Sequence, residues 1–345
     1  MSKRVRVGVI GLGKIAERAH LPHFAASTHA ELRAVSSSRP AAARAACKLY
    51  AIPNVFADWR ELVRSEAIDA VAICAPNDVH AEIALSALRY GKHVLVEKPI
   101  ATRLSDAARM VRAARAERRV LEVHHNLRFH PVAVAARAVM RRGVIGAVIG
   151  FEGVLCHRGP KGWAPRAAWF FDPARVGGGV LMDLGTHTFD LLSYFVGEPA
   201  ERIAAVSVGA AAPSGGSAEH QASCLVTLLS GAVGSISVGW RDSNYRNRWY
   251  FTGELGALEL DFTGDGRLVL HGARGARSLP LAGEGTLLTA QQAFVDRVRG
   301  KQSSGVAQGA SGEDGLYALS LALAAQRALA SNSSVRLQRA SRKAS

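Results

Sequence analysis

Short apolar runs alternate with amphipathic segments along the first part of the chain. The runs have the length of buried strands, and the segments between them have the periodicity of helices. The predicted strands are residues 5–10, 32–35, 70–74, 93–96 and 120–124, and the predicted helices are 41–50, 59–65, 79–90 and 104–119, with another that starts at Lys14 and bends or ends near Pro22. This alternation predicts an α/β domain with a doubly wound parallel sheet, which binds its ligand beyond the carboxyl ends of its strands.

The pattern changes after about residue 145, where strands follow one another through glycine-containing turns. The predicted strands are 147–155, 202–208, 222–229, 232–238, 249–252, 257–260 and 268–270, and the predicted helices are 182–196, 287–299 and 316–330. They predict an α+β domain with a large, mostly antiparallel sheet and helices enough to cover only one of its faces. We therefore expect a first domain over residues 1–125, a second over 126–330 whose C-terminal helix packs back on the first, and a basic tail over 331–345.

Composition narrows the class of protein. The chain has 345 residues, of which 48% are hydrophobic, and this is ample for two cores. No stretch is apolar over the ~20 residues that a membrane helix requires. The four cysteines lie far apart, without a CxxC pair or a Cys/His cluster, at positions 47, 74, 156 and 224. These features predict a cytoplasmic protein with no membrane partner, no disulfide framework and no metal.

The net charge of +15 comes largely from arginines on predicted helix faces and in the tail. We interpret this charge as a solvated surface, because net charge governs solubility and non-specific binding more than fold. Attraction of phosphorylated ligands or of nucleic acid is the alternative. No interleaving of aromatic and basic residues supports nucleic acid, and we expect no nucleic-acid partner.

A glycine-rich motif, Gly11-Leu12-Gly13-Lys14-Ile15-Ala16, follows the first predicted strand. Gly11 permits a tight turn, Gly13 lets the backbone approach a pyrophosphate, and the helix that follows directs amide donors at the phosphates. The alternative is a glycine-rich turn of an ordinary α/β protein. Its place after the first strand favours a dinucleotide site that includes Gly11, Gly13, Lys14 and Ile15.

The second predicted strand leads into Ser37-Ser38-Arg39, and no acidic residue occurs between Glu31 and Asp58. Enzymes that use NAD commonly have an acidic residue here, which binds the ribose hydroxyls. Hydroxyls and a guanidinium suit a 2′-phosphate instead, since arginine offers a planar fork of donors. We therefore favour NADP over NAD, with an ordinary polar loop as the alternative.

Two further strand ends carry candidate groups. Pro76 and Asn77 follow the fourth predicted strand, where the nicotinamide ribose is expected, and His80 suits either cofactor contact or a structural role at the start of a helix. Lys98 follows the next strand within Glu97-Lys98-Pro99. Its charge can polarise a hydroxyl or carbonyl oxygen and stabilise developing negative charge, although a surface lysine is the simpler interpretation of Lys98 alone.

Asp183 and His187 are four residues apart, so on a regular helix they share one face. A neutral histidine takes an alcohol proton near pH 7, and the aspartate can orient the substrate or the imidazole. The alternatives are a carboxylate that interacts with the helix dipole, a core histidine, and a pair of metal ligands for which no third ligand is evident. With Lys98, this pair forms our candidate catalytic set.

Gly11–Ala16, Glu97-Lys98-Pro99 and the segment Gly178–His187 together resemble the glucose–fructose oxidoreductase/inositol dehydrogenase/rhizopine catabolism (Gfo/Idh/MocA) family, over roughly residues 3–330. The resemblance implies a Rossmann domain, an open-faced sheet domain and NAD(P)-dependent redox chemistry on sugars, polyols or their derivatives. It also implies that Lys98 is the catalytic lysine and that Asp183 and His187 are the substrate and acid/base pair.

The same resemblance indicates other groups. Glu97, Asn126 and Arg128 belong to segments that line the cofactor site, and the C-terminal sheet implies a homo-dimer or homo-tetramer. Candidate substrate residues are Lys98, Arg128, Trp163, Arg166, Trp169, Asp183 and His187, with His157, Arg158 and Lys161 nearby in sequence. The alternatives to a sugar oxidoreductase are a reductase of a non-sugar carbonyl or imine and a catalytically silent, NADP-binding regulator.

Overall fold

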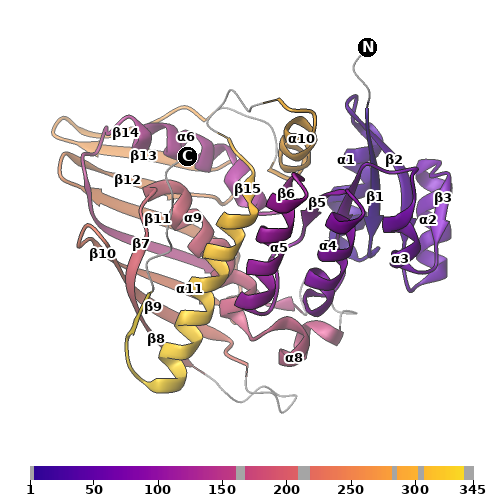
Figure 1. The fold of residues 1–345 in the computed structure, drawn as a ribbon. Helices are drawn as coiled ribbons and strands as arrows, with labels where there is room; N and C mark the ends of the chain where they lie inside the picture. The colour runs from indigo at the N-terminus through magenta and orange to yellow at the C-terminus, as the bar shows by residue number, and fades with distance from the viewer. Residues whose placement is uncertain (1–3, 161–167, 209–217, 282–285, 302–306, 338–345) are drawn as a thin grey trace. The chain divides into compact units, whose positions relative to one another are not determined.

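The computed structural model describes residues 4–160, 168–208, 218–281, 286–301 and 307–337. The chain forms two compact units, which we describe separately (Figure 1). The first comprises the residues up to Phe129 together with the segments Ala174–Gly177 and Glu284–Leu319. The second comprises His130–Pro173, Gly178–Gly283 and the residues from Ser320 onward. No helix among the described residues is both long enough and apolar enough to cross a membrane.

The first unit is built on a seven-stranded sheet with the order β15-β6-β5-β4-β1-β2-β3. The strands are β1 (Val5–Ile10), β2 (Ala30–Ser36), β3 (Asn54–Phe56), β4 (Ala70–Ile73), β5 (His93–Val96), β6 (Leu121–Val123) and β15 (Ala310–Ser311). β1 to β6 are parallel, and β15 joins β6 antiparallel. The strand order reverses between β1 and β4, which is the switch point where such sheets bind ligands. The predicted doubly wound sheet is confirmed.

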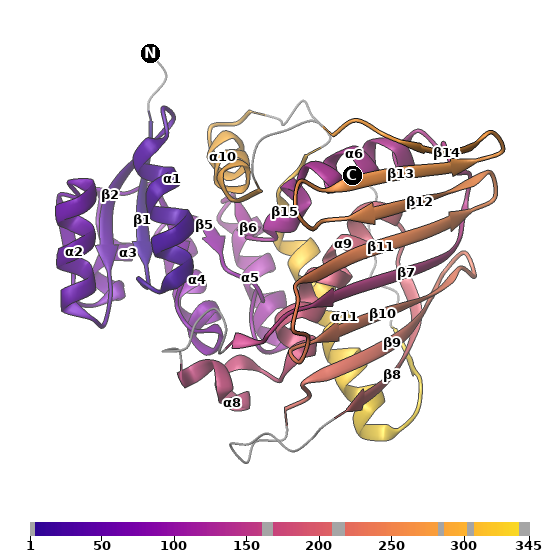
Figure 2. The ribbon, with the colours of Figure 1, turned by 180° about the vertical axis from the view of Figure 1, so that it is seen from behind.

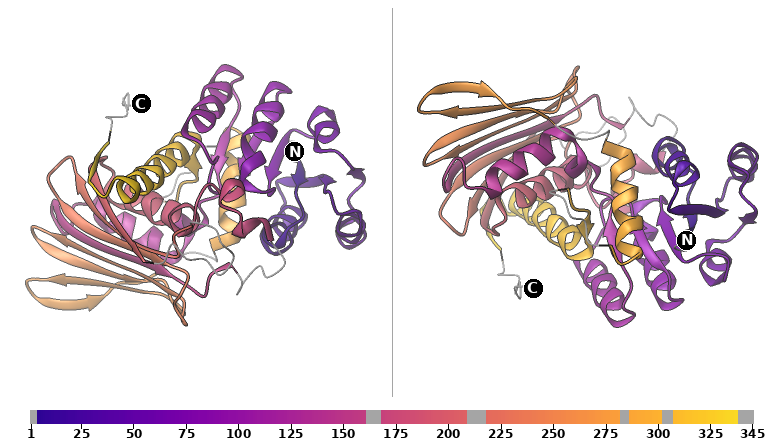
Figure 3. Two further views of the ribbon diagram at one scale, coloured as in Figure 1. Left: turned by 90° about the horizontal axis from the view of Figure 1, so that it is seen from below. Right: turned by 90° about the horizontal axis from the view of Figure 1, so that it is seen from above.

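Helices cover both faces of this sheet (Figure 3). They are α1 (Leu21–Ala26), α2 (Pro40–Tyr50), α3 (Trp59–Arg64), α4 (His80–Arg89), α5 (Leu104–Ala116) and α10 (Thr286–Val298). α1, α2 and α10 share one hydrophobic core with β1, whereas α4 packs against α3 and α5. Because both faces are covered, β1 is apolar except for the partly buried Arg6, and its Val7 and Val9 are fully buried.

The helix that starts at Lys14 continues through Pro22 and does not end there. It does so through a π-helical turn at Ala16–His20, and α1 then begins with Pro22 in its first turn. A proline in the first turn needs no N–H donor, so the helix tolerates it. The wider turn leaves His20 fully buried, which matters for the site below.

The second unit contains a nine-stranded sheet with the order β14-β13-β12-β11-β7-β10-β9-β8-β16 (Figure 2). The strands are β7 (Val148–Cys156), β8 (Ala200–Val208), β9 (Gln221–Leu228), β10 (Val233–Gly239), β11 (Arg246–Gly253), β12 (Gly256–Asp261), β13 (Arg267–Gly272), β14 (Gly275–Ser278) and β16 (Val335–Arg336). β7 and β10 pair parallel, and every other neighbouring pair is antiparallel. The predicted antiparallel α+β domain is therefore confirmed.

Helices pack on one face of this sheet. α6 (Pro131–Arg141) contacts β12 and β13, and α9 (Thr186–Val196) contacts β7. A short helix at Ala168–Phe171 belongs to this unit, and α11 (Gly312–Ser331) contributes its later residues to it. The next short helix, α8 (Pro173–Val176), lies almost entirely in the first unit. β9 alternates strictly between buried residues and residues open to solvent, as expected of a sheet covered on one side.

Two predictions for this unit are corrected. The sequence predicts one regular helix over 182–196, but the chain enters α9 through a π-helical turn at Leu181–Gly185. The shared-face argument for Asp183 and His187 assumed regular geometry; in the structure Asp183 is buried and His187 is half-buried. Residues 335–337, which the sequence assigns to the basic tail, belong to the folded unit, because β16 pairs with the edge strand β8 and the N–H of Leu337 donates to the carbonyl of Glu201 at 2.8 Å. This pairing satisfies backbone groups that an open sheet edge leaves free.

A buried carboxyl group lies at the edge of the first sheet. Glu122 of β6 has a side chain that is 2% exposed, and its Oε1 lies 2.8 Å from Nε of Arg297 on α10. Burial raises the pKa of Glu122 to about 7, although Arg297 and Arg128 both oppose the rise. The folded protein therefore holds a proton on Glu122 at pH values where the unfolded chain has released it.

We predict that this group makes stability fall as the pH rises. The contribution of Glu122 to the free energy of unfolding is fully present below its ordinary pKa of 4.5 and is lost as the pH rises toward 7. The loss is on the order of 3 kcal/mol, since each pKa unit corresponds to about 1.4 kcal/mol. The denaturant midpoint, measured from pH 5 to 8, should depend less on pH in Glu122→Gln than in the wild type. The exposed control Glu254→Gln should keep the wild-type dependence on pH. Equal slopes in wild type and Glu122→Gln would contradict the assignment.

Candidate active site

The turn after β1 requires glycine at its first position. Gly11 has φ of +86°, and a Cβ there would lie 2.7 Å from the carbonyl carbon of Cys74. A Cβ on Gly13 would have no neighbour within 4 Å among the described residues, so its backbone is open to a ligand. Lys14 and Ile15 begin the helix, and Ile15 packs against the core. Open backbone beside a helix N-terminus fits the pyrophosphate of a dinucleotide.

Hydroxyl and guanidinium groups follow the end of β2. Ser37 accepts a hydrogen bond from the backbone N–H of Arg39 at 3.1 Å, and Ser38 and Arg39 are exposed. The guanidinium of Arg39 donates to the carbonyl of Leu12 and lies 4.0 Å from the carboxylate of Glu17. An exposed donor fork beside the glycine turn fits a phosphate on the adenosine ribose.

The residues after β4 are held by backbone contacts. The buried side-chain amide of Asn77, which follows Pro76, donates to the carbonyl of Val176 at 3.1 Å. His80 is fully buried, with Nδ1 2.8 Å from the carbonyl of Pro99 and Nε2 2.9 Å from a second backbone carbonyl. Burial lowers the pKa of His80. These contacts favour the structural role for His80 over direct cofactor contact.

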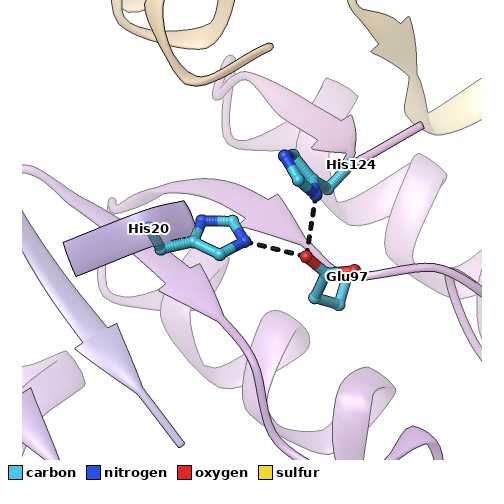
Figure 4. A group of neighbouring side chains, drawn as sticks. All are labelled: His20, Glu97 and His124. Atoms are coloured by element: carbon cyan, nitrogen blue, oxygen red, sulfur yellow. Dashed lines mark hydrogen bonds and ion pairs between the residues drawn. The ribbon is translucent and has the colours of Figure 1, made fainter. Parts of the chain in front are cut away.

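Lys98 follows β5 and is half-buried, and the residue before it is fixed in place (Figure 4). Oε1 of Glu97 lies 2.8 Å from Nε2 of His20 and 2.8 Å from Nδ1 of His124. The amide nitrogen of Gln291 on α10 lies 3.0 Å from the other ring nitrogen of His124. Burial raises the pKa of Glu97, but the two histidines outweigh it and hold the pKa well below its ordinary value.

Sequence reasoning missed His20, His124 and Gln291. Their only signal is the pair His124-His125 directly after a predicted strand, since nothing in the pattern links residues 20, 97, 124 and 291. Ligand atoms of His20, Glu97 and His124 all lie within 4.8 Å of one another, which is also a spacing that a metal ion accepts.

Asn126 and Arg128 lie on a 3₁₀ turn, Asn126–Phe129, after β6. The Arg128 side chain is 5% exposed, and its Nη1 lies 3.3 Å from Oδ2 of Asp314. Part of its guanidinium is therefore engaged with the protein, while Asn126 is half-buried.

The first unit brings several predicted cofactor residues to one edge of its sheet. Gly11, Arg39, Asn77 and Lys98 follow the carboxyl ends of β1, β2, β4 and β5, and these strands are parallel. The carboxyl ends of parallel strands meet at the same edge. This edge combines an open glycine turn, an exposed arginine and a half-buried lysine, which suits a dinucleotide with its reacting end near Lys98.

Asp183 belongs to the second unit and is 3% exposed. Its Oδ2 accepts a hydrogen bond from Nε1 of Trp240 at 2.9 Å and lies 4.0 Å from Nε2 of His157. Nδ1 of His157 accepts the backbone N–H of Gly159 at 2.8 Å, so a neutral His157 ring carries its proton on the nitrogen that faces Asp183. The carboxylate therefore lies among aromatic and imidazole donors. Trp240 is another residue that the sequence did not reveal.

The glycine run before Asp183 packs against one backbone segment. A Cβ on Gly179 would clash with the carbonyl oxygen of Glu219. The Glu219 carboxylate accepts the N–H of Gly179 at 3.2 Å and that of Leu181 at 3.1 Å. Glu219 thus satisfies the N–H groups that the start of the π turn leaves free. No sequence signal pointed to Glu219.

The remaining predicted substrate residues are placed in part. His187 lies in the first turn of α9, and the Trp169 ring lies 5.1 Å from that of Phe170, centroid to centroid. Arg158 donates to the carbonyl of Ser243 at 2.7 Å. Lys161, Trp163 and Arg166 lie outside the described residues.

Comparison with known proteins agrees with this geometry. Residues 5–125 match the GFO/IDH/MocA family model described as an oxidoreductase family with an NAD-binding Rossmann fold. Residues 133–259 match the model of the GFO/IDH/MocA C-terminal domain.

Relatives resemble the chain over most of its length. Myo-inositol 2-dehydrogenase of Thermotoga maritima is 29% identical and covers 97% of this chain and 99% of its own. The 1,5-anhydro-D-fructose reductase of Ensifer adhaerens is 30% identical over 81% of this chain and 82% of its own. The structure of a levoglucosan dehydrogenase in complex with NADH and levoglucosan has a TM-score of 0.86 at 24% identity, covering 98% of this chain and 100% of its own, which shows the same fold.

We predict that Trp240→Phe lowers the free energy of unfolding more than a tryptophan-to-phenylalanine change that breaks no hydrogen bond. Trp240→Phe removes one hydrogen-bond donor from a buried carboxylate oxygen, at a cost of about 1–3 kcal/mol beyond the lost packing. Trp249→Phe is the control, because Nε1 of that buried indole has no hydrogen-bond partner among the described residues. Denaturant unfolding of both variants measures the difference, and equal losses would contradict the prediction.

Proposed function

Because this chain belongs to the GFO/IDH/MocA family of NAD-binding oxidoreductases, we propose that it transfers a hydride between a nicotinamide cofactor and a carbon that bears a hydroxyl or carbonyl in a sugar, polyol or sugar derivative. The observation that carries the proposal is the open glycine turn after β1 on the same sheet edge as Lys98. The substrate class is supported by the relatives named for myo-inositol and for 1,5-anhydro-D-fructose.

The chemistry assigns one task to each candidate residue. The bound cofactor accepts or supplies the hydride. The Lys98 ammonium polarises the reacting oxygen and stabilises the negative charge that develops on it. A ring nitrogen of His187 takes the alcohol proton in oxidation and returns it in reduction. Asp183, held by Trp240, orients the substrate hydroxyls or the imidazole.

The proposal extends to the compartment. All four cysteines are free thiols, which suits the reducing cytoplasm.

We expect variants of Lys98 and His187 to have different kinetic effects, because the two residues have different proposed roles. Lys98→Ala should abolish turnover while cofactor binding persists, because its charge acts on the reacting oxygen. His187→Ala should lower kcat by roughly 10²–10⁴, the usual span for a positioned acid or base, and should remove the limb of the pH–rate profile near neutrality. The assay uses polyols, nucleotide sugars and lactones with each cofactor. Wild-type kcat in His187→Ala across neutral pH would make Lys98 the candidate proton donor.

We expect tighter binding of NADPH than of NADH, because Ser37, Ser38 and Arg39 occupy the place of an acid. Arg39→Ala should weaken NADPH by about 1.5–3 kcal/mol, the value of a hydrogen bond to a charged group, and leave NADH nearly unchanged. Fluorescence titration with both cofactors measures this, and Arg44→Ala on the exposed side of α2 is the control. Equal affinities of the wild type for the two cofactors would refute the preference.

We further propose a homo-dimer or homo-tetramer joined through the uncovered sheet face. Its apolar residues include Val206, Val208, Leu225 and Val233, which are 68%, 64%, 60% and 51% exposed. Large exposed apolar side chains gathered on one sheet face favour association with a partner. Light scattering at micromolar concentration should give a multiple of the chain mass, and Leu225→Glu should shift it toward the monomer. A wild-type monomer would refute the assembly.

A further inference from the structure

The buried cluster around Glu97 is not used by the chemistry proposed above, yet it adjoins Lys98 in the chain. The Glu97 side chain is 11% exposed, and those of His20 and His124 are 1% exposed. A carboxylate so far from water needs N–H donors to remain charged. Both imidazoles supply them to one oxygen, Oε1 (Figure 4).

Gln291 decides where the protons lie on both rings. Its amide nitrogen is 3.0 Å from Nε2 of His124 and 3.4 Å from Nδ1 of His20. A carboxylate only accepts and an amide NH₂ only donates, so each ring carries its proton on the nitrogen that faces Glu97. Both imidazoles are then neutral, and Glu97 holds the one charge of the cluster. Burial lowers the pKa of His20, which agrees with a neutral ring.

The same ligand atoms would also fit around a divalent cation, but a bound cation would leave more buried polar groups of the cluster without hydrogen bonds. A metal ion needs the lone pairs of the two nitrogens that face Glu97, which moves both protons to the nitrogens that face Gln291. Gln291 would then have to present its oxygen to both rings and leave its buried NH₂ without acceptors. The hydrogen-bonded arrangement leaves only Oε1 of Gln291 without a partner among the described residues. The cluster is thus complete as a hydrogen-bond network.

The segment that carries Lys98 is held on both sides. The N–H of Glu97 donates to Ile73 of β4 at 2.9 Å, and the carbonyl of Pro99 lies 2.8 Å from the buried ring of His80. The Glu97 side chain adds the two imidazole contacts. Lys98 lies between two residues with fixed positions, so its backbone has little freedom to move.

We propose that His20, His124 and Gln291 are positioning residues that hold Glu97, and through it the Lys98 ammonium, in the geometry that hydride transfer requires. The proposal rests on the proposed function, in which Lys98 acts on the reacting oxygen. A displacement of about 1 Å in a reacting group can lower a rate by roughly a hundredfold. The network therefore acts on kcat more than on cofactor affinity.

The test compares variants that remove a donor with variants that keep one. His124→Leu and His20→Met remove the N–H that Glu97 accepts, whereas His124→Asn and His20→Gln place an amide N–H near the same position. We expect kcat to fall roughly ten- to hundredfold in the first pair and to recover most of that loss in the second, with cofactor affinity little changed. His23→Met is the matched control, because His23 is buried close enough to His20 to interact with it electrostatically, and no hydrogen bond joins it to Glu97.

A second readout does not depend on turnover. Reductive ¹³C-methylation gives a resonance for Lys98, assigned by its loss in Lys98→Arg. We expect this resonance to shift or broaden in His124→Leu and to return in His124→Asn. If His124→Leu and His20→Met do not fold, Gln291→Leu is measured in their place. This variant keeps both histidines and removes only the amide that contacts their rings.

The outcomes separate the two proposals. Wild-type kcat in the variants that lack a donor, well below their melting temperatures, would overturn the positioning role. An unchanged Lys98 resonance would overturn it as well. Wild-type turnover in Lys98→Ala would instead refute the catalytic assignment of Lys98, and the resonance would still report whether the network holds that side chain.

Discussion

The charge on Glu97 has to be matched by hydrogen-bond donors, because an unmatched buried carboxylate costs several kcal/mol. The first unit meets this demand from separate elements. His20 comes from the π turn before α1, His124 follows β6, and Gln291 comes from α10. Together they bring segments far apart in sequence to the carboxyl end of β5. The requirement to satisfy one charge thus fixes the surroundings of Lys98.

The second unit meets a similar constraint at Asp183. This carboxylate is also buried, and the indole of Trp240 donates one hydrogen bond to it. Asp183 lies in a π-helical turn, as His20 does in the first unit, and such turns recur at functional sites because they redirect side chains without ending the helix. Glu219 satisfies N–H groups at the start of the turn. In both units a local departure from the α-helix coincides with a buried polar contact beside a candidate catalytic residue.

Contacts of this kind explain which parts of the structure can be predicted from the sequence and which cannot. The central strands β4 and β5 of the first unit read as apolar runs. The burial of β9 alternates strictly along the strand. Periodicity therefore finds both sheets. The motif residues Gly11 and Lys98 lie at strand ends that the same pattern predicts. The π turn before α1 and the pairing of β16 depend on contacts between distant segments, which periodicity does not encode. The His20–Glu97–His124 cluster was missed for this reason, and α6 was missed although its own sequence is amphipathic.

The proposed preference for NADPH rests on a comparison of two charge–charge interactions at Arg39, whose guanidinium also donates to the carbonyl of Leu12. Its guanidinium lies 4.0 Å from Glu17, and the two side chains are 61% and 57% exposed. An exposed ion pair of this kind contributes no more than about 1 kcal/mol, because water and salt screen it and two long side chains lose freedom. A hydrogen bond to a charged phosphate contributes about 1.5–3 kcal/mol. On this comparison we expect a phosphate to displace Glu17 from Arg39, and this expectation is the basis of the proposed preference for NADPH.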